Sequence, residues 1–414
     1  MQHAHALARF AVGASLVFGG LATAAPITLD QAIQRADSRP LVGMANASAE
    51  VARHDAEQAS LSTYNPQLSA SAGPRFVAGE RSIAFDIGLG HTFELGGKRD
   101  ARRAVADAKI ESADAEIVAA RLRARIEAWR AFQVALVMRE RVAMAMEAEQ
   151  VASQVQTATT ERQKVGFGTQ LEINLTTSEV GRARHDRLDA ERKYDAAVAE
   201  LASAIGAGAS ETFEPEGQLV PPPMLATDVN ALVARAMKER PEARVARAST
   251  NVARAEIRAA DAQAVPDLSI GVTYAYERDP DATSQTILGS VGIGLPVFNR
   301  NQGARKAARS TSRRAEIELA WTSTEIEREV RVAISGYTRA REAVLGFDKE
   351  VNERLHENLE LARASYTSGK IDYFQFNVVR RELLASRNAY LDAFEETVEA
   401  WSDVQQALGG EVKP

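Results

Sequence analysis

The chain has 414 residues, a formal net charge of −6, and a composition of 45% hydrophobic and 26% charged residues. This slightly acidic balance argues against a nucleic-acid-binding protein, which needs a basic surface. The absence of cysteine excludes disulfides, thiol nucleophiles, zinc fingers and iron–sulfur clusters.

The first 24 residues have the pattern of a secretory signal peptide. Arg9 precedes an apolar run over residues 10–21, and residues 22–24 supply the small side chains of a cleavage site. We expect cleavage after Ala24, which removes Arg9 and leaves 49 basic and 56 acidic residues, a net charge of −7. The mature chain therefore leaves the cytoplasm, and without a cysteine it carries no N-terminal lipid.

The rest of the chain contains a tandem repeat. Arg39-Pro40 recurs as Arg240-Pro241, and further matching positions follow at offsets between 200 and 203. A stretch ending in three consecutive prolines predicts an extended connector between the halves. The predicted organisation is a signal peptide over 1–24, a first repeat over 25–212, a Pro-rich connector over 213–226 and a second repeat over 227–414.

Each half has the same predicted order of elements: a helix, two strands, a very long helix and a return helix. Residues 100–160 contain neither proline nor glycine, so a helix there would be about 90 Å long and must project from any compact domain. The corresponding segment 304–366 contains only Gly336 and Gly346. The predicted bounds are about 29–61, 67–95, 100–160 and 170–206 in the first half, and about 229–264, 267–298, 304–366 and 371–408 in the second.

The second long segment carries a coiled-coil seam. Its apolar residues recur at alternating steps of four and three, which predicts left-handed helix packing. These residues are Ile326, Val330, Ala333, Tyr337, Ala340, Val344, Phe347 and Val351. The step becomes four at Leu355 and Leu359, which predicts a stutter that locally unwinds the supercoil.

The paired strand segments alternate apolar residues with small or polar ones over about ten positions. Ile83, Phe85, Ile87, Leu89 and Phe93 form the apolar set of one strand. In an exported protein this alternation favours outer-membrane barrel strands over a half-buried soluble sheet. Four strands cannot close a barrel, and lipid does not tolerate an open sheet edge. Three copies would supply twelve strands, so the residues predict a homotrimer.

No side-chain pattern predicts an enzyme, a metal site or a cofactor. The histidines of the mature chain are scattered, and no two have the i, i+4 spacing of a helical zinc site. They are His54, His91, His185 and His356. We therefore expect no catalytic residue, no bound metal and no cofactor.

The two strand-to-helix junctions, residues 93–99 and 295–301, resemble those of the TolC-type outer-membrane factors, the trimeric exit ducts of Gram-negative efflux and secretion systems. The resemblance covers essentially the whole mature chain. The sequence Glu-Leu-Gly-Gly-Lys-Arg at residues 94–99 is similar to the heavy-metal branch, the outer component of cobalt–zinc–cadmium pumps. The resemblance implies a mainly α fold with a small β part. Long coiled-coil-like helices would form a periplasmic tunnel, and four strands per chain would contribute to a 12-stranded trimeric transmembrane β-barrel.

The resemblance also implies location and partners. The duct would lie in the outer membrane of a Gram-negative cell, in contact with its lipid, and extend into the periplasm. A periplasmic adaptor (membrane fusion) protein and an inner-membrane pump of the resistance-nodulation-division type would complete a tripartite system. No nucleic acid is expected. The loops between long and return helices would form the tunnel tip and contact the adaptor through Gly166, Phe167, Gly168, Gly369 and Lys370.

A periplasmic gate is implied in the same way. In the family, an acidic residue six positions after the first tip glycine bonds a tyrosine three positions before the second and keeps the tip closed. Glu172 and Tyr366 occupy those positions. Gln375 stands where many members have an acidic residue of a selectivity ring. We therefore do not expect an acidic ring at that point.

Basic residues cluster at the starts of both long helices, at Lys98 and Arg99 and again at Arg300. Positive charge at a helix N-terminus opposes the helix dipole, so it needs a negative partner. Anionic lipid headgroups would supply one, with Phe93 and Phe298 beside them at the membrane interface. The alternative is a solvated surface patch.

The expected function is passive conduction of substrates, with divalent heavy-metal cations as the favoured class, from a pump–adaptor complex across the outer membrane. Drug efflux or type I secretion through the same architecture is the alternative transport function. A secreted coiled-coil structural or adhesive protein is the alternative of another class, but it leaves the alternating strands unexplained.

Overall fold

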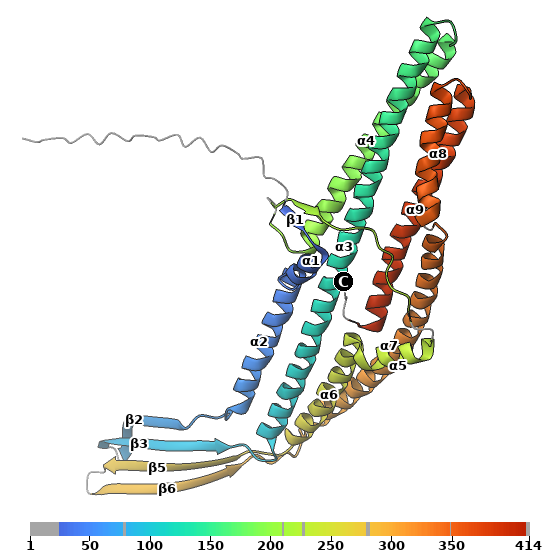
Figure 1. The fold of residues 1–414 in the computed structure, drawn as a ribbon. Coiled ribbons are helices and arrows are strands. Elements are labelled where there is room, and N and C mark those ends of the chain that lie inside the picture. Colours follow the sequence, from blue (N-terminus) through green and yellow to red (C-terminus); the bar gives the residue numbers. More distant parts are fainter. Residues whose placement is uncertain are drawn as a thin grey trace, which may run out of the picture.

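A computed structural model describes residues 25–77, 80–208, 211–225, 228–278, 282–347 and 349–410 (Figure 1). The predicted signal peptide over 1–24 lies outside these residues. The molecule is elongated, with a four-stranded sheet at one end and the turns of two helical hairpins at the other.

The sheet contains two strands from each half. Its order is β2-β3-β5-β6, all antiparallel, and the central β3–β5 pair places Phe93 opposite Leu268. The strands span Gln67–Val77 (β2), Glu80–Phe93 (β3), Leu268–Arg278 (β5) and Thr283–Ile293 (β6). The two halves therefore share one sheet, and β2 and β6 are its edges within the described chain.

Four helices leave the sheet and lie side by side in the matching order α2-α3-α6-α7 (Figure 1). They span Pro40–Ser60 (α2), Lys98–Lys164 (α3), Pro241–Ala262 (α6) and Gln302–Leu345 (α7). The prediction of one continuous helix at the start of each half is wrong. Short helices α1 (Leu29–Ala36) and α5 (Val229–Glu239) are separate from α2 and α6. Proline has no N–H to donate and disfavours helical geometry in the residue before it, so Pro40 and Pro241 each begin a new helix.

The two long segments differ in continuity. α3 runs unbroken for 67 residues. The expected helix over 304–366 is instead divided into α7, which ends at Leu345, and α8 (Lys349–Thr367). Glycine is a poor helix former, and Gly346 ends α7 where α3 has no glycine. The return helices are α4 (Gln170–Ala204) and α9 (Tyr373–Leu408).

The coiled-coil seam of α7 is confirmed. Ile326, Val330, Tyr337, Ala340 and Val344 are all buried, mainly against α9 and α5. The side chains of the predicted seam residues Val351 and Leu355 lie outside the described residues, while Leu359 is buried.

The middle of the molecule joins the halves. A parallel pair of short strands, β1 (Ala25–Ile27) and β4 (Phe213–Pro215), anchors the start of the connector. The connector then crosses to α7, where the buried Tyr337 hydroxyl lies 2.9 Å from the Pro222 carbonyl oxygen and 2.7 Å from that of Pro223. Burial raises the pKa of Tyr337 to about 12, so the hydroxyl stays a donor at physiological pH.

Candidate functional site

The two faces of the sheet have opposite character. One face is apolar and exposed, with Leu68 at 76% and Val291 at 74% exposure. The strand register places Leu89, Val272, Ile87 and Ile287 on the same face. The other face carries mainly serine, glycine, alanine and threonine. A soluble sheet would not leave a continuous apolar face uncovered, so one side suits lipid and the other suits water.

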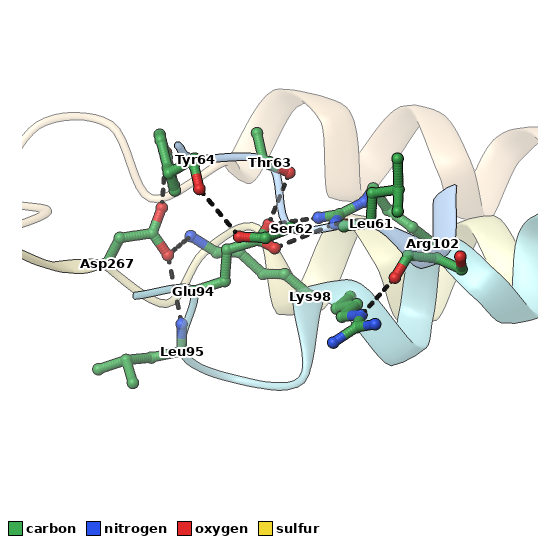
Figure 2. Close-up of polar contacts among 11 residues, drawn as sticks. Leu61, Ser62, Thr63, Tyr64, Glu94, Leu95, Lys98, Arg102 and Asp267 are labelled. Carbon is green, nitrogen blue, oxygen red and sulfur yellow. Dashed lines mark hydrogen bonds and ion pairs between the residues drawn. The ribbon is translucent and has the colours of Figure 1, made fainter. Parts of the chain in front are cut away.

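The first strand-to-helix junction is held by a polar network around Asp267 (Figure 2). Its carboxylate accepts hydrogen bonds from Lys98 Nζ at 2.7 Å, from the Tyr64 hydroxyl at 2.9 Å and from the Leu95 backbone N–H at 3.3 Å. Burial alone would raise the pKa of Asp267, but these bonds outweigh it and hold the pKa below its ordinary value. The network fastens α3, in the first half, to the start of β5, in the second.

Glu94 extends the network on the same side of the junction. It pairs with Arg102 and accepts a bond from Thr63 Oγ1 at 3.0 Å, and Arg102 also donates to the Leu61 carbonyl at 3.0 Å. The bond from Arg102 holds the pKa of Glu94 below its usual range. These contacts tie the end of α2 to the beginning of α3.

Two expected membrane-interface residues have other partners. Lys98 is only 6% exposed and is neutralised by Asp267, so its proposed contact with lipid headgroups is wrong. The negative partner that a basic helix start requires is supplied by the protein itself. Arg99 donates to the Ser60 carbonyl at 2.6 Å. Phe93 and Phe298 are exposed, at 45% and 92%, and Arg300 is an exposed residue whose Nε lies 3.3 Å from the Pro296 carbonyl.

The second junction is built differently. Asn301 caps α7 with a left-handed backbone, as Gly97 caps α3, and its side chain donates to the Ala260 carbonyl at 2.8 Å. Arg305 pairs with Asp261 at 2.5 Å. Sequence reasoning missed the Asp267–Lys98 pair, although a signal existed: Gln67 corresponds to Asp267 in the first repeat, so the carboxylate occurs in only one copy.

The α3–α4 turn contains three of the predicted tip residues. Gly166 has a φ of 85°, which favours glycine, and a Cβ on Gly168 would lie 3.0 Å from the Gln163 backbone nitrogen. Phe167 is 77% exposed at the end of the hairpin. Glu172 lies in the first turn of α4, where its carboxylate accepts from the Thr169 N–H at 3.0 Å.

The α8–α9 turn repeats this construction. Gly369 has a φ of 76°, and Lys370 is exposed beside it. Asp372 accepts from the Gln375 N–H at 2.8 Å, and Gln375 Oε1 accepts from the Asp372 N–H at 3.0 Å. Glu172 and Gln375 therefore have the same structural role, because each completes a capping box at the start of a return helix.

Tyr366 does not pair with Glu172 within the chain, contrary to the family-based expectation. Its hydroxyl lies 2.5 Å from Thr159 Oγ1, and its ring is buried. The Arg162 guanidinium lies 5.1 Å from the centre of that ring. The Glu172 carboxylate is engaged in the capping box of α4, and Tyr366 is buried against α3. The two side chains are therefore held apart.

Polar contacts join the two tip hairpins along their length. Buried Arg380 of α9 pairs with Glu179 of α4, and Arg387 of α9 donates to Glu147 of α3 at 2.5 Å. Sequence reasoning did not identify Arg380. Its signal was an arginine flanked by Phe376 and Leu383, both buried positions of the same helix.

A family model described as outer membrane efflux protein matches residues 29–207 and, again, residues 232–410. The chain belongs to the outer membrane efflux protein family. Together the matches cover most of the chain and place one copy of the family pattern on each half.

Named relatives agree with this assignment. The chain is 25% identical over 323 residues to the cobalt-zinc-cadmium resistance protein CzcC of Cupriavidus metallidurans. The aligned region covers 76% of this chain and 75% of CzcC. VceC of Vibrio cholerae superimposes with a TM-score of 0.72 at 19% identity, covering 93% of this chain and 97% of VceC. CmeC of Campylobacter jejuni gives 0.75 at 14% identity, covering 99% and 94%.

The predicted fold class and cellular location are therefore confirmed. The chain is an outer-membrane efflux channel subunit whose four strands contribute to the barrel and whose long helices extend into the periplasm. The family works as trimeric channels with adaptor and pump partners. In the part of the chain that the structure describes, no helix is long and apolar enough to cross a membrane. No three metal-ligating side chains gather there either.

Proposed function

We propose that three copies of this chain form the outer-membrane exit duct of a tripartite system that exports divalent heavy-metal cations. The observation that carries the substrate class is the similarity to CzcC over three quarters of both chains. The structure of one chain supports the proposed trimer, because its sheet ends in two edge strands and the apolar face of that sheet is exposed. The duct itself needs no catalytic group, since the pump supplies the energy.

The adaptor is proposed to dock at the ends of the two hairpins. Phe167 is exposed at one tip, and Phe374 is 58% exposed near the other. Apolar side chains at the end of a helical hairpin suit contact with another helical tip. Gly166, Gly168, Gly369 and Lys370 would shape the turns that present them. Phe93, Arg99, Phe298 and Arg300 are proposed to lie at the membrane interface.

The periplasmic gate is proposed to lie within the same tips. Glu172, Tyr366 and Gln375 occupy the positions that the family uses. In this chain we infer that closure rests on contacts between the hairpins, above all Arg380 with Glu179 and Tyr366 with Thr159. Opening would separate α4 from α9 and α3 from α8, and would expose these buried polar groups to water.

Growth of a deletion strain tests the substrate class. The strain, with and without the restored gene, is challenged with cobalt, zinc, cadmium, nickel, copper and a panel of organic drugs. We expect restorable sensitivity confined to the metals. Sensitivity to drugs alone would keep the duct and replace the substrate. A soluble periplasmic monomer on fractionation would contradict the duct itself.

A further inference from the structure

The lipid-facing side of the sheet carries two arginines at its far end. Arg81 is the second residue of β3, and Arg278 is the last residue of β5. Both lie at the end of the sheet that is farthest from the helices (Figure 1). Because the helices extend into the periplasm, this end of the barrel is the one that faces the cell exterior.

The strand register places both arginines on the apolar face. Side chains an even number of residues apart in a strand point to the same side of the sheet. Arg81 therefore shares a face with Ile87 and Leu89 of β3, and Arg278 shares it with Val272 of β5. These cations stand on the side of the sheet that suits lipid, not on the side that suits water.

The two arginines are diagonal neighbours on the central strand pair. β3 and β5 pair Ala84 with Glu277, so the next step of this register sets Arg278 beside Ile83, two residues from Arg81. Diagonal positions lie about 7 Å apart in an antiparallel pair. Both side chains are exposed, and neither has a hydrogen-bond or ion-pair partner among the described residues. Two such charges repel each other, so an anion bound between them would stabilise both.

The water-facing side has its own counter-ions at the same end of the sheet. There Arg75 of β2 forms an ion pair with Glu277 of β5. A cation that faces the lumen is thus neutralised within the chain, whereas the lipid-facing pair is not. This difference indicates that the counter-ion of Arg81 and Arg278 belongs to the membrane.

The height of Arg81 matches a layer of lipid headgroups. Arg81 precedes Phe93 by twelve residues in β3. At about 3.4 Å per residue and a strand tilt of about 40°, this separation is about 31 Å along the membrane normal. The apolar band of an outer-membrane barrel is about 25 Å tall. With Phe93 at the periplasmic border, Arg81 therefore stands about 6 Å beyond the band on the outer side.

An aromatic layer lies between the arginines and the aliphatic band. The rings of Phe85 and Tyr276 stack with their centres 5.0 Å apart, and the Tyr274 ring lies 6.3 Å from Phe85. Such aromatic residues mark the interfaces of outer-membrane barrels. From the outside inwards this face presents cations, aromatic rings and aliphatic side chains. The same order suits the phosphates, the sugars and the acyl chains of a glycolipid.

We propose that Arg81 and Arg278 bind a phosphate group of lipid A, the phosphorylated glycolipid of the outer leaflet of a Gram-negative outer membrane. Each guanidinium would donate charge-assisted hydrogen bonds to the phosphate oxygens. Exposed Thr283 and Gln285, which pair with Arg278 and Tyr276, would contact the sugar. The site lies on the central strands of one sheet, so it depends on the outer-membrane location and not on the proposed cargo.

Titration of the intact channel with bisphosphorylated lipid A tests the site. The channel is purified in detergent, and the apparent Kd is measured by native mass spectrometry. Each arginine near an anionic lipid surface contributes about fivefold, so we expect Arg81→Gln with Arg278→Gln to raise the Kd about thirtyfold. The matched control removes the same charge at the periplasmic end, with Arg103→Gln and Arg300→Gln, both exposed. The Kd for lipid A is expected to stay unchanged in this control.

A panel of lipids keeps the test decisive even where the double variant fails to assemble, because it needs only the unmodified channel. Dephosphorylated lipid A is expected to bind about thirtyfold more weakly than the phosphorylated form. Equal Kd values for the two forms, or an equal loss in the control variant, would overturn the site. Tighter binding of phosphatidylglycerol than of lipid A would also overturn it. In each of these cases the proposed efflux function would stand, since the growth test does not depend on this site.

Discussion

Asp267 shows how one side chain can join two halves of a chain. It accepts hydrogen bonds from Lys98, Tyr64 and Leu95, which belong to the first half, while it stands at the head of a second-half strand. Such a pair is costly to break, because the remaining charge stays in a place where water reaches it poorly. The junction is therefore the point where a conservative change should have a large effect.

Replacing Lys98 by methionine removes the cation and leaves Asp267 ionised. We expect the free energy of unfolding to fall by about 3 kcal/mol, as for other broken buried ion pairs. Guanidinium denaturation of the detergent-solubilised protein measures the change. Arg99→Met is the matched control, since Arg99 is exposed, and an equal loss in both variants would contradict this account.

The lowered pKa values of Asp267 and Glu94 predict sensitivity to acid. Near their ordinary values, at about pH 4, the unfolded chain binds more protons than the folded one. Their contribution is therefore present above that pH and is lost as the pH falls through the lower folded values. Unfolding midpoints measured from pH 6 to pH 3 should fall less steeply for Asp267→Asn. A parallel pH dependence would contradict the assignment.

At the scale of elements, the turns at the helical tips depend on local capping. Thr169 and Asp372 begin α4 and α9, and each forms a reciprocal pair with the residue three positions later. These boxes explain why polar residues occupy the expected gate positions. They also keep the first turn of each return helix from fraying.

Thr169→Ala removes one acceptor of the box at α4. A lost N-cap costs about 1 kcal/mol, so local opening of the tip should become several times more frequent. Limited trypsin cleavage after Lys164 measures that opening. Thr157→Ala is the control, because Thr157 bonds only a carbonyl within its own helix. Equal cleavage of both variants would show that the cap does not limit opening.

The elements themselves were only partly predictable. Repeats, alternation and heptads depend on spacing alone, so the sheet strands and the buried seam of α7 could be predicted. The helix boundaries at Pro40, Pro241 and Gly346 were not predicted, although the residues themselves were visible in the sequence. These boundaries depend on local backbone chemistry, which hydrophobic periodicity does not report. Asp267 and Arg380 carried a signal as single residues, but their pairing with Lys98 and Glu179 was not predictable, because each pair joins positions far apart in sequence that only the assembled halves bring together.

At the scale of the whole molecule, the two tip hairpins are joined by polar contacts and by a buried hydrophobic cluster formed by α3, α8 and α9. Arg380 is 4% exposed and pairs with Glu179 across the two hairpins. Arg380→Met is expected to leave Glu179 without its buried partner, weaken the closed state by about 3 kcal/mol and raise the current through the channel in planar bilayers. Arg381→Met, at an exposed neighbour, is the control, and unchanged current in both would contradict a closing role for this pair.

The central strand pair has a consequence for biogenesis. β3 pairs with β5, and Phe93 lies opposite Leu268. This pair cannot form until Leu268, 175 residues later in the chain, has left the translocation machinery. Pairing between such distant segments is slow, and the unpaired strands are prone to aggregate meanwhile. The first half thus cannot enter the membrane while the chain is still being exported. Periplasmic holding factors must shield its apolar strands until about two thirds of the polypeptide has arrived.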